Sequence, residues 1–414
     1  MKILHFADIH ARDKDLDEVS KCLGFIVSKA QEERPDLIVF AGDFFHSRDV
    51  KLDSEAARLV IRSFSQLADI APVAAVIGTP SHDGKAPEIL SMVRGAFPVY
   101  VAIKPEQVYL YQGSFFDVQE AKGYNLKTGL LISLLPQPTK EYFSQTNEGS
   151  IAEGDQAVGG LLGGVFMGFG AMASEFRAPH ILVGHFTVKG SSTSTGQPMI
   201  GREIEVSKEA LDLARADLVC LGHIHKRQWI QPNIYYAGSI YRENFGEQED
   251  KGFYIHEYYD GQRPAFESRF ISTPTRKLRK IEIDTTSGGE LESLDLAIIP
   301  DIARNPITGA SVRVEIKAWQ DEAALIDRAA IEKLLMESGA ESVDIRIIRV
   351  PRETVRSTEI MQLSTLPDKV KELARTRGEG VPASILEKAD LVERLPQDQI
   401  LERVSNGGLG IGIA

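Results

Sequence analysis

Apolar and polar positions alternate along the first part of the chain, up to about residue 270, in two different rhythms. Short runs rich in Val, Ile and Leu suit buried strands, and they read "KILHFA", "DLIVFAG", "VAAVIG", "HILVGH" and "DLVCLGH". Between them, "SKCLGFIVSKAQEE" and "SEAARLVIRSFSQLA" place apolar residues at helical spacing. This alternation of strands and helices predicts a layered α/β core.

After about residue 275 the pattern changes to a small α+β unit. "KIEI", "ASVRVEI" and "SVDIRII" are typical of strands, and "AALIDRAAIEKLLMESG" is typical of a helix. Beyond Pro351, "LPDKVKELARTRG" and "VPASILEKADLVERL" predict two amphipathic helices, followed by a loose tail, "SNGGLGIGIA". We therefore predict three domains, at residues 1–274, 275–350 and 351–414.

One uncharged segment, residues 158–173, reads "VGGLLGGVFMGFGAMA" and carries small residues at a spacing of four, Gly160, Gly164 and Gly168. It is shorter than the roughly 18 apolar residues that a membrane-spanning helix needs, and charged residues stand at both ends. We expect a buried, close-packed helix, with a membrane element or a partner-facing surface as the alternatives.

Composition narrows the class of protein only moderately. The 414 residues include 47 basic and 59 acidic side chains, a net charge of −12 that gives no support to a simple electrostatic nucleic-acid binder. Such binding is not excluded, because only charge near the site matters at the screening length of cell salt. Two cysteines in apolar surroundings, Cys22 and Cys220, indicate a reducing compartment. With no signal peptide before the first strand, we expect a cytoplasmic protein.

Histidine and aspartate residues gather at or just after the ends of the predicted strands. Because strand ends and their loops form the ligand crevice of an α/β sheet, residues far apart in sequence converge there. The set consists of Asp8, His10, Asp43, His46, His82, Asp83, His185, His223 and His225. Any one of these would be typical of a core or capping residue, whereas the ordered set predicts a site. His5, His180 and His256 lack this context and are expected to be structural, as is Cys220.

The chemistry that suits this set is a two-metal hydrolase. Imidazoles and carboxylates together favour divalent transition ions such as manganese, iron or zinc. Two such ions, roughly 3.5–4 Å apart, can hold a phosphate, lower the pKa of a bridging water and stabilise the leaving oxygen. A carboxylate shared between the ions would hold them that close, and Asp43 is the best candidate.

The motifs "DIH", "GDFFH", "HD", "GH" and "GHIH" resemble the five motifs of the calcineurin-like metallophosphoesterases. Within that superfamily the chain is most similar to the SbcD nuclease family, the bacterial and phage counterpart of the eukaryotic double-strand-break repair nuclease. "YYAGSIYRENFGEQEDKGF" resembles that family's closing strand segment, and the α+β unit resembles its DNA-capping domain. The resemblance implies a layered β-sandwich flanked by helices, then a capping domain and a helical partner-binding segment.

The resemblance also implies roles for individual residues. One ion, usually manganese, would be bound by Asp8, His10, Asp43 and His225. The second ion would share Asp43 and take His185 and His223. His82 matches the histidine of the family's third motif, which protonates the leaving group or stabilises the phosphate, and Asp83 would orient it. His46 joins these two as a candidate catalytic residue.

The third motif departs from the family's Gly-Asn-His-Asp, because this chain reads "GTPSHD". The asparagine that ligates the second ion has no counterpart. Ser81 stands before the histidine and Thr79 follows the glycine, and both hydroxyls are weaker, neutral oxygen donors. Pro80 fixes its own φ and pushes Thr79 toward extended geometry, so the loop is stiff. We expect a functional variant rather than an inactivated site, with Ser81 preferred over Thr79 as the replacement ligand.

Substrate and partners follow from the same resemblance. It implies exonuclease and endonuclease cleavage of DNA by a homodimer that works with an SbcC-type ATPase. Lys226 and Arg227 and the basic cluster at residues 276–280 are candidate phosphate contacts, although a solvated basic edge is equally common. The two terminal helices carry apolar stripes that would pack on a partner coiled coil or on each other, at Leu366, Val370, Leu373, Ile385, Ala389 and Val392.

Two other functions compete with this one. The first is a metallophosphoesterase for small phosphodiesters, which would need neither a capping domain nor a partner. The second is a catalytically weak DNA-end scaffold, in which the altered third motif abolishes turnover.

Overall fold

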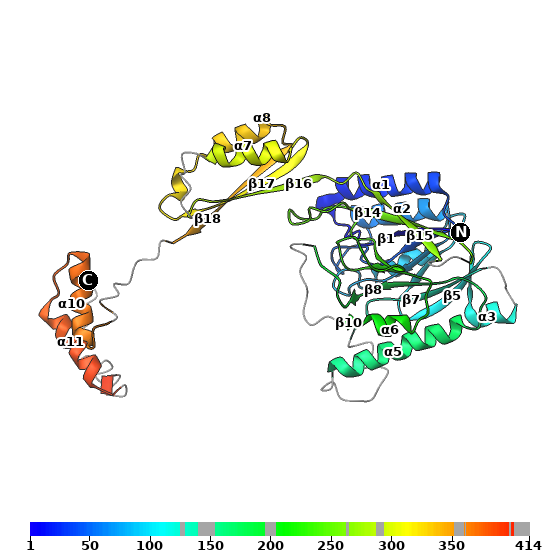
Figure 1. Cartoon of the computed structure of the whole chain (residues 1–414), viewed down its shortest axis with the longest axis horizontal. Coiled ribbons are helices and arrows are strands. Elements are labelled where there is room, and N and C mark those ends of the chain that lie inside the picture. Colours follow the sequence, from blue (N-terminus) through cyan, green and yellow to red (C-terminus); the bar gives the residue numbers. More distant parts are fainter. Residues whose placement is uncertain are drawn as a thin grey trace. The chain divides into compact units, whose positions relative to one another are not determined.

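The structure, a computed structural model, describes residues 1–124, 129–139, 154–194, 204–261, 265–286, 294–351, 360, 362–396 and 399–400 (Figure 1). The chain divides into two compact units. The first contains Met1–Asp284, Glu290–Ile316 and Asp327–Ile347, and the second contains Thr285–Gly289, Lys317–Ile326 and Ile348–Ala414.

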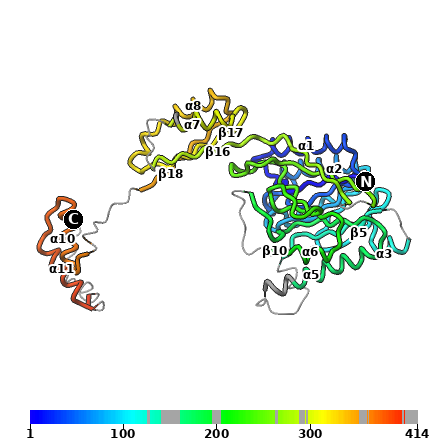
Figure 2. Tube along the Cα trace, viewed as in Figure 1, coloured from blue at the N-terminus to red at the C-terminus, as the bar shows by residue number. Residues whose placement is uncertain are grey.

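A six-stranded sheet with the order β15-β14-β1-β2-β3-β4 forms one half of the core. The strands are β1 (Lys2–Phe6), β2 (Leu37–Phe40), β3 (Val73–Val76), β4 (Val99–Ala102), β14 (Gly252–Tyr258) and β15 (Phe266–Ser272). From β1 to β4 neighbouring strands are parallel, whereas β14 runs antiparallel to β1. Ile3 pairs with His256, so the start of the chain (blue in Figure 2) and a segment far along the sequence (green) lie in the same sheet.

A seven-stranded sheet with the order β12-β13-β11-β8-β7-β5-β6 forms the other half. Its strands are β5 (Glu106–Tyr111), β6 (Ser114–Asp117), β7 (Leu130–Leu135), β8 (His180–His185), β11 (Leu218–Gly222), β12 (Gln228–Gln231) and β13 (Ile234–Tyr236). β7, β8, β11 and β13 are parallel to one another. β9 (Thr187–Val188), which follows β8 along the chain, pairs in parallel with β10 (Glu205–Val206).

Three apolar layers hold the two sheets and their helices together, as the alternation of buried residues along the strands requires. Leu4 and Phe6 of β1 pack toward α1 (Leu16–Glu33) and α2 (Glu55–Ala68). Ile3 and Ala7 face the second sheet. The far side of that sheet is covered by α5 (Gly154–Ala173) and α6 (Lys208–Asp212), as Figure 1 shows. This four-layer arrangement confirms the predicted α/β β-sandwich flanked by helices.

Helix α5 bears out the expectation for the glycine-rich segment on one of its faces only. Its buried face consists of Leu162, Phe166 and Phe169, which pack on the sheet. Gly160 and Gly164, by contrast, are exposed, and a Cβ built on either would meet nothing within 4 Å. The prediction of a buried, close-packed helix therefore holds for the buried face and for Gly170, where a Cβ would lie 2.1 Å from Leu213 O, and not for the outward-facing glycines. None of the helices in the described part of the chain is long and apolar enough to cross a membrane.

The C-terminal part begins with a three-stranded sheet, β16-β17-β18, formed by Lys277–Asp284, Ala310–Trp319 and Ser342–Val350. The predicted helix is α8 (Arg328–Glu337). A second helix, α7 (Leu294–Arg304), escaped prediction because it contains Pro300, which normally ends a helix.

The two predicted terminal helices are α10 (Leu366–Arg377) and α11 (Ala383–Arg394), which pack side by side. The Thr365 hydroxyl caps the start of α10 by accepting from Asp368 N, and Gly378 ends it with a left-handed φ of 70°. The predicted tail lies outside the described residues.

Candidate metal centre

Six predicted ligands meet where the carboxyl ends of strands from both sheets come together. Asp8 and His10 follow β1, and Asp43 follows β2 in the same sheet. His185 ends β8, and His223 and His225 follow β11 in the other sheet. Their side chains form two groups whose ligand atoms lie within 4.8 Å of one another: Asp8, His10 and His225, and Asp43, His185 and His223. All six residues are buried.

Four of these ligands have a backbone conformation that side chains other than glycine rarely adopt. The φ angles are 53° at Asp8, 44° at His10, 61° at Asp43 and 86° at His223. Hydrogen bonds fix these turns, because Asp8 N donates to Gly42 O at 3.0 Å and His10 N to Asp43 O at 3.1 Å. The turns point the side chains inward, so the strain is located where the ligands converge.

Two glycines leave the room that the ligands occupy. Gly42 has a φ of 91°, and a Cβ built on it would lie 2.5 Å from His185 Nδ1. A Cβ on Gly78 would lie 2.2 Å from Asp43 Oδ1. Both glycines are therefore required by the close approach of a ligand, which explains the "AGD" and "IGT" sequences after β2 and β3.

The first half of the centre, formed by Asp8, His10 and His225, brings three possible ligand atoms together. His10 Nε2 and His225 Nε2 are 3.0 Å apart. His225 Nδ1 donates to Glu247 Oε1 at 3.1 Å, so its Nε2 offers a lone pair. Asp8 Oδ2 is buried and has no hydrogen-bond partner among the described residues. A cation would satisfy all three atoms, so these residues fit a divalent ion.

Asp43 joins this first half to the second half of the centre, which Asp43 forms together with His185 and His223. Its Oδ2 lies 3.5 Å from His10 Nε2 and 3.3 Å from His185 Nε2, the position expected of a bridging ligand. His185 Nδ1 donates to Ala41 O at 2.6 Å and so directs Nε2 toward Asp43. Burial opposes a charge on His185, but the Asp43 carboxylate raises the pKa of His185 to about 9. The ring of His223 lies edge-on to that of His185, with centroids 5.1 Å apart.

Thr79, and not Ser81, lies beside the second half of the centre. The Thr79 hydroxyl is 3.2 Å from Asp43 Oδ2 and 3.3 Å from His185 Nε2, and Thr79 N donates to Asp43 Oδ1 at 2.6 Å. Ser81 is exposed, and its carbonyl accepts from Arg48 N at 2.9 Å. The geometry thus favours Thr79 over the predicted Ser81, because the Thr79 carbonyl accepts from the N–H groups of both His82 and Asp83. The resulting turn carries Ser81 outward.

His82 is held beside the first half of the centre by a backbone carbonyl. Its Nδ1 donates to His46 O at 2.8 Å, which leaves Nε2 free to face a substrate. The His82 ring lies edge-on to that of His10, with centroids 4.8 Å apart. His10, Asp43 and His82 also form a group of possible ligand atoms within 4.8 Å, so His82 is close enough to act on a phosphate held there.

Asp83 has a different role from the one predicted. Its two oxygens accept from the backbone N–H groups of four residues: Asp43, Phe44, Phe45 and Gly78. Asp83 thus ties the loop after β2 to the loop after β3, and it does not orient His82. Burial and the nearby Asp43 carboxylate raise the pKa of Asp83. The four donors favour its charged form.

The ring of His46 lies beside the centre, in a group with His10 and Glu243 whose possible ligand atoms are within 4.8 Å of one another, but Arg12 also engages it. Arg12 Nη1 lies 2.9 Å from His46 Nε2 and 3.1 Å from Nδ1. Burial and the Arg12 charge lower the pKa of His46 to about 4. The structure gives His46 a positioning role through the carbonyl that holds His82, and the predicted catalytic role of its ring stays a prediction.

Sequence reasoning missed the carboxylates that support the first half. Glu247 is buried and lies 3.1 Å from the buried Lys251 ammonium as well as from His225. Glu243 Oε1 is 4.0 Å from His10 Nδ1 and has no hydrogen-bond partner among the described residues. Both belong to "YRENFGEQEDKGF", which carries no spacing rule that marks a carboxylate as a partner of a distant histidine.

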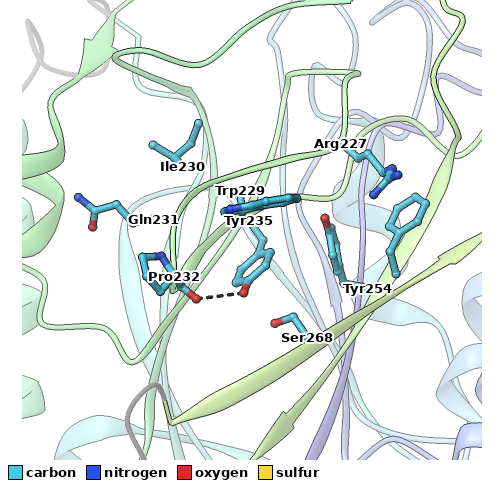
Figure 3. Close-up of a pocket in the computed structure, with 9 residues that line it drawn as sticks. Arg227, Trp229, Ile230, Gln231, Pro232, Tyr235, Tyr254 and Ser268 are labelled. Carbon is cyan, nitrogen blue, oxygen red and sulfur yellow. Dashed lines mark hydrogen bonds between the residues drawn. The ribbon is translucent and has the colours of Figure 1, made fainter.

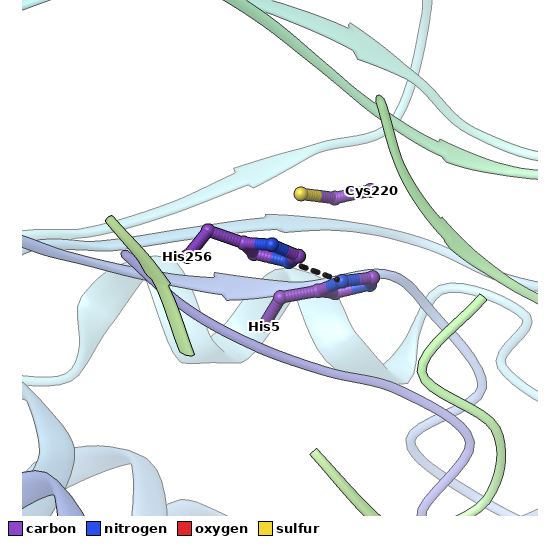
Figure 4. Close-up of side chains that lie close together, drawn as sticks. All are labelled: His5, Cys220 and His256. Atoms are coloured by element: carbon purple, nitrogen blue, oxygen red, sulfur yellow. Dashed lines mark hydrogen bonds between the residues drawn. The ribbon is translucent and has the colours of Figure 1, made fainter. Parts of the chain in front are cut away.

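A second histidine cluster lies between the sheets (Figure 4) and agrees with the structural role expected for it. His5 Nε2 donates to Leu221 O at 3.2 Å, and His5 Nδ1 lies 3.3 Å from His256 Nε2. His256 Nδ1 lies 2.7 Å from Ser268 Oγ. Every ring nitrogen therefore has a partner, although Cys220 is close enough for the three to form a possible ligand group. His180 is likewise buried, and its Nε2 is hydrogen-bonded to Ser133 Oγ at 2.7 Å.

The basic cluster at residues 276–280 is largely used within the protein. Arg276 binds Asp15 at 3.1 Å and donates from its backbone N–H to Glu18. Arg279 pairs with Asp301 at 3.2 Å, and Lys280 pairs with Glu315 at 2.8 Å. Acidic partners thus neutralise three of the predicted phosphate contacts.

Comparison with known proteins gives a match over the first half of the chain. The sequence profile of the family "Calcineurin-like phosphoesterase" matches residues 1–227. The fold is similar to that of a dimetal phosphatase from Danio rerio, with a TM-score of 0.40 and 11% identity over 66% of this chain and 97% of that chain. A second solved structure has a TM-score of 0.36 and 10% identity over 66% of this chain and 98% of its own.

Proposed function

Since the chain belongs to the calcineurin-like phosphoesterase family, we propose that it is a metal-dependent DNA nuclease, the exonuclease and endonuclease subunit of an SbcCD-like complex that processes double-strand breaks. The family uses a dimetal centre, and the observation that carries hydrolysis is the position of Asp43 between His10 and His185. Two ligand groups that share one carboxylate fit two divalent ions, with manganese proposed as the metal.

When bound, two divalent ions supply Lewis acidity toward a phosphate oxygen and a water of lowered pKa. The protein contributes the geometry around them. Ala41 O and Glu247 fix the tautomers of His185 and His225, so that both present Nε2 to the centre. Because Nδ1–H is held by His46 O, Nε2 is the nitrogen that would face the leaving oxygen, and the doubly protonated ring would give it the Nε2 proton.

The parts beyond the centre support a large substrate and a protein partner. Beyond the two sheets that carry the centre, β16, β17 and β18 form a third sheet, which a hydrolase of small phosphodiesters does not need. In the terminal helices Leu373, Ile385 and Val392 remain 43%, 47% and 45% exposed. Exposed apolar side chains on paired helices support the docking of a partner coiled coil, which we propose to be an SbcC-type ATPase bound to a homodimer.

The test is cleavage of linear and hairpin DNA with manganese, with and without the partner ATPase, alongside bis-p-nitrophenyl phosphate. Metal-dependent DNA cleavage is the expected result, and Asp43→Asn is the inactive control. Efficient cleavage of the small ester without cleavage of DNA would favour a small-molecule phosphodiesterase. DNA binding with neither activity would favour the scaffold. Deletion of the residues after Pro351 should leave metal binding intact and abolish capture of the ATPase.

A further inference from the structure

An open pocket lies at the edge of the β-sandwich, outside the metal centre (Figure 3). Its volume is about 580 Å³, within the range of small-molecule sites. The side chains that give it its character are Arg227, Trp229, Tyr235, Tyr254, Ser268 and Phe270. Four of these six are aromatic, so the pocket suits a ligand with flat apolar faces.

Strand pairing brings the four rings together. Trp229 of β12 is opposite Tyr235 of β13, and Tyr254 of β14 is opposite Phe270 of β15. Residues directly opposite each other point to the same face of a sheet. The rings of Tyr235 and Tyr254 meet edge-on, with centroids 5.2 Å apart, and so link the two sheets. The pocket is therefore built by the fold and not by a chance grouping of side chains.

Two side chains in the pocket, Trp229 and Arg227, are placed so that a ligand could contact them. Trp229 is 67% exposed although it is the largest side chain on its strand. The Arg227 guanidinium lies 4.4 Å from the centre of the Phe270 ring and also hydrogen-bonds Tyr254. A guanidinium held over an aromatic ring can still offer its remaining N–H groups to a further planar group.

We propose that this pocket binds unpaired nucleobases of a nucleic-acid strand. Stacking on aromatic side chains together with cationic contacts is the general mode of single-strand recognition, because every base has a π-face. Among the described residues that line the pocket Arg227 alone is charged, and its sign suits a polyanion, although the Asp250 carboxylate lies 4.0 Å from its Nη2. The Ser268 hydroxyl and the Gln231 amide add polar groups for the edges of a base.

The position of the pocket relative to the metal centre fits one continuous strand. Arg227 follows the ligand His225 by two residues and Trp229 follows it by four. Four residues span at most about 14 Å, so Trp229 lies within a few nucleotides of a phosphate at the metals. This inference rests on the proposed nuclease function, and it adds that the strand being cut is unpaired next to the cleavage site.

Trp229 also provides the measurement, since the chain contains two tryptophans. In the full-length Trp319→Phe protein, Trp229 is the sole tryptophan and its fluorescence reports on the pocket. We would titrate this protein with oligo(dT) and with an abasic oligonucleotide of equal length, both in EDTA so that no cleavage occurs. Oligo(dT) should quench the fluorescence and bind more tightly than the abasic strand.

Removing the ring should weaken binding of oligo(dT) while leaving the abasic strand unaffected. Base stacking contributes roughly 1–3 kcal/mol, so Trp229→Ala should weaken oligo(dT) about 5- to 150-fold, measured by fluorescence anisotropy of labelled DNA. The matched control is Tyr259→Ala, which removes another exposed aromatic ring just after β14 and outside the pocket, and it should bind like wild type.

Equal affinity of Trp229→Ala and wild type for oligo(dT) would overturn the proposal, as would equal binding of the abasic strand. A change in self-association with unchanged oligo(dT) binding would also overturn it and would make the pocket a protein interface. Base-dependent binding without manganese-dependent cleavage would support the pocket while contradicting the nuclease activity.

Discussion

The two halves of the metal centre are supported by different chemistry. In the first half, His225 donates to the carboxylate of Glu247, which a buried lysine in turn neutralises. In the second half, His185 donates to the neutral Ala41 carbonyl, and the Thr79 hydroxyl is the additional oxygen that could bind the second ion. A carboxylate partner makes an imidazole a stronger ligand than a carbonyl does. The second ion should therefore be the weaker one, and the altered third motif falls on that half.

The largest effect should come from the residue that both halves share. Asp43→Asn removes the negative charge that lets two cations lie close together, so both ions and all hydrolysis should be lost. Metal content by plasma spectrometry and hydrolysis of bis-p-nitrophenyl phosphate measure this. The exposed Asp53→Asn is the control for the chemical change. An Asp43→Asn protein that keeps near-normal turnover would rule out the shared-carboxylate centre.

His82→Ala should be the next largest change, and it should leave both halves loaded. Loss of a positioned proton donor lowers the rate by roughly 10²–10⁴-fold. His46→Ala keeps the carbonyl that holds His82, so its rate should stay much closer to wild type. The measurement is single-turnover hydrolysis with metal content recorded in parallel. If His46→Ala fell as far as His82→Ala, the His46 ring would be catalytic after all.

The sequence was sufficient for the parts that local patterns determine. Runs of Val, Ile and Leu located the central strands, and the order of Asp and His residues after them located six ligands that the structure brings together. Contacts that depend on the path of a loop could not be predicted from the sequence. Ser81 and Thr79 are equivalent as hydroxyls in "GTPSHD", and only the turn around Pro80 distinguishes them. Likewise Asp83 looked like a partner of its neighbour His82, but its oxygens accept from backbone groups about 40 residues away in sequence.

The difference between the halves can be sharpened at Glu247. Glu247→Gln keeps the shape of the side chain and removes its charge, so His225 becomes a weaker ligand. Loss of such a supporting carboxylate typically lowers metal affinity about 10–100-fold, and only the first ion should be affected. Manganese titration of the metal-free protein by calorimetry would show one weakened step. The exposed Glu267→Gln is the control, and equal weakening of both steps would contradict the independence of the halves.

The smallest effect, and the most specific to this chain, is expected in the second half at Thr79. Its hydroxyl lies 3.2 Å from Asp43 Oδ2 and 3.3 Å from His185 Nε2, so Thr79→Ala removes a neutral oxygen from the second ion alone. We expect roughly tenfold weaker binding of that ion, the low end for a supporting group, and recovery of activity in excess manganese by mass action. Ser81→Ala should change neither step, because Ser81 faces solvent. Thr79→Asn would supply an amide oxygen, a stronger donor than a hydroxyl, and should tighten the second step above wild type. If Ser81→Ala weakened that step and Thr79→Ala did not, the loop would turn the other way when metal binds, and the original preference for Ser81 would stand.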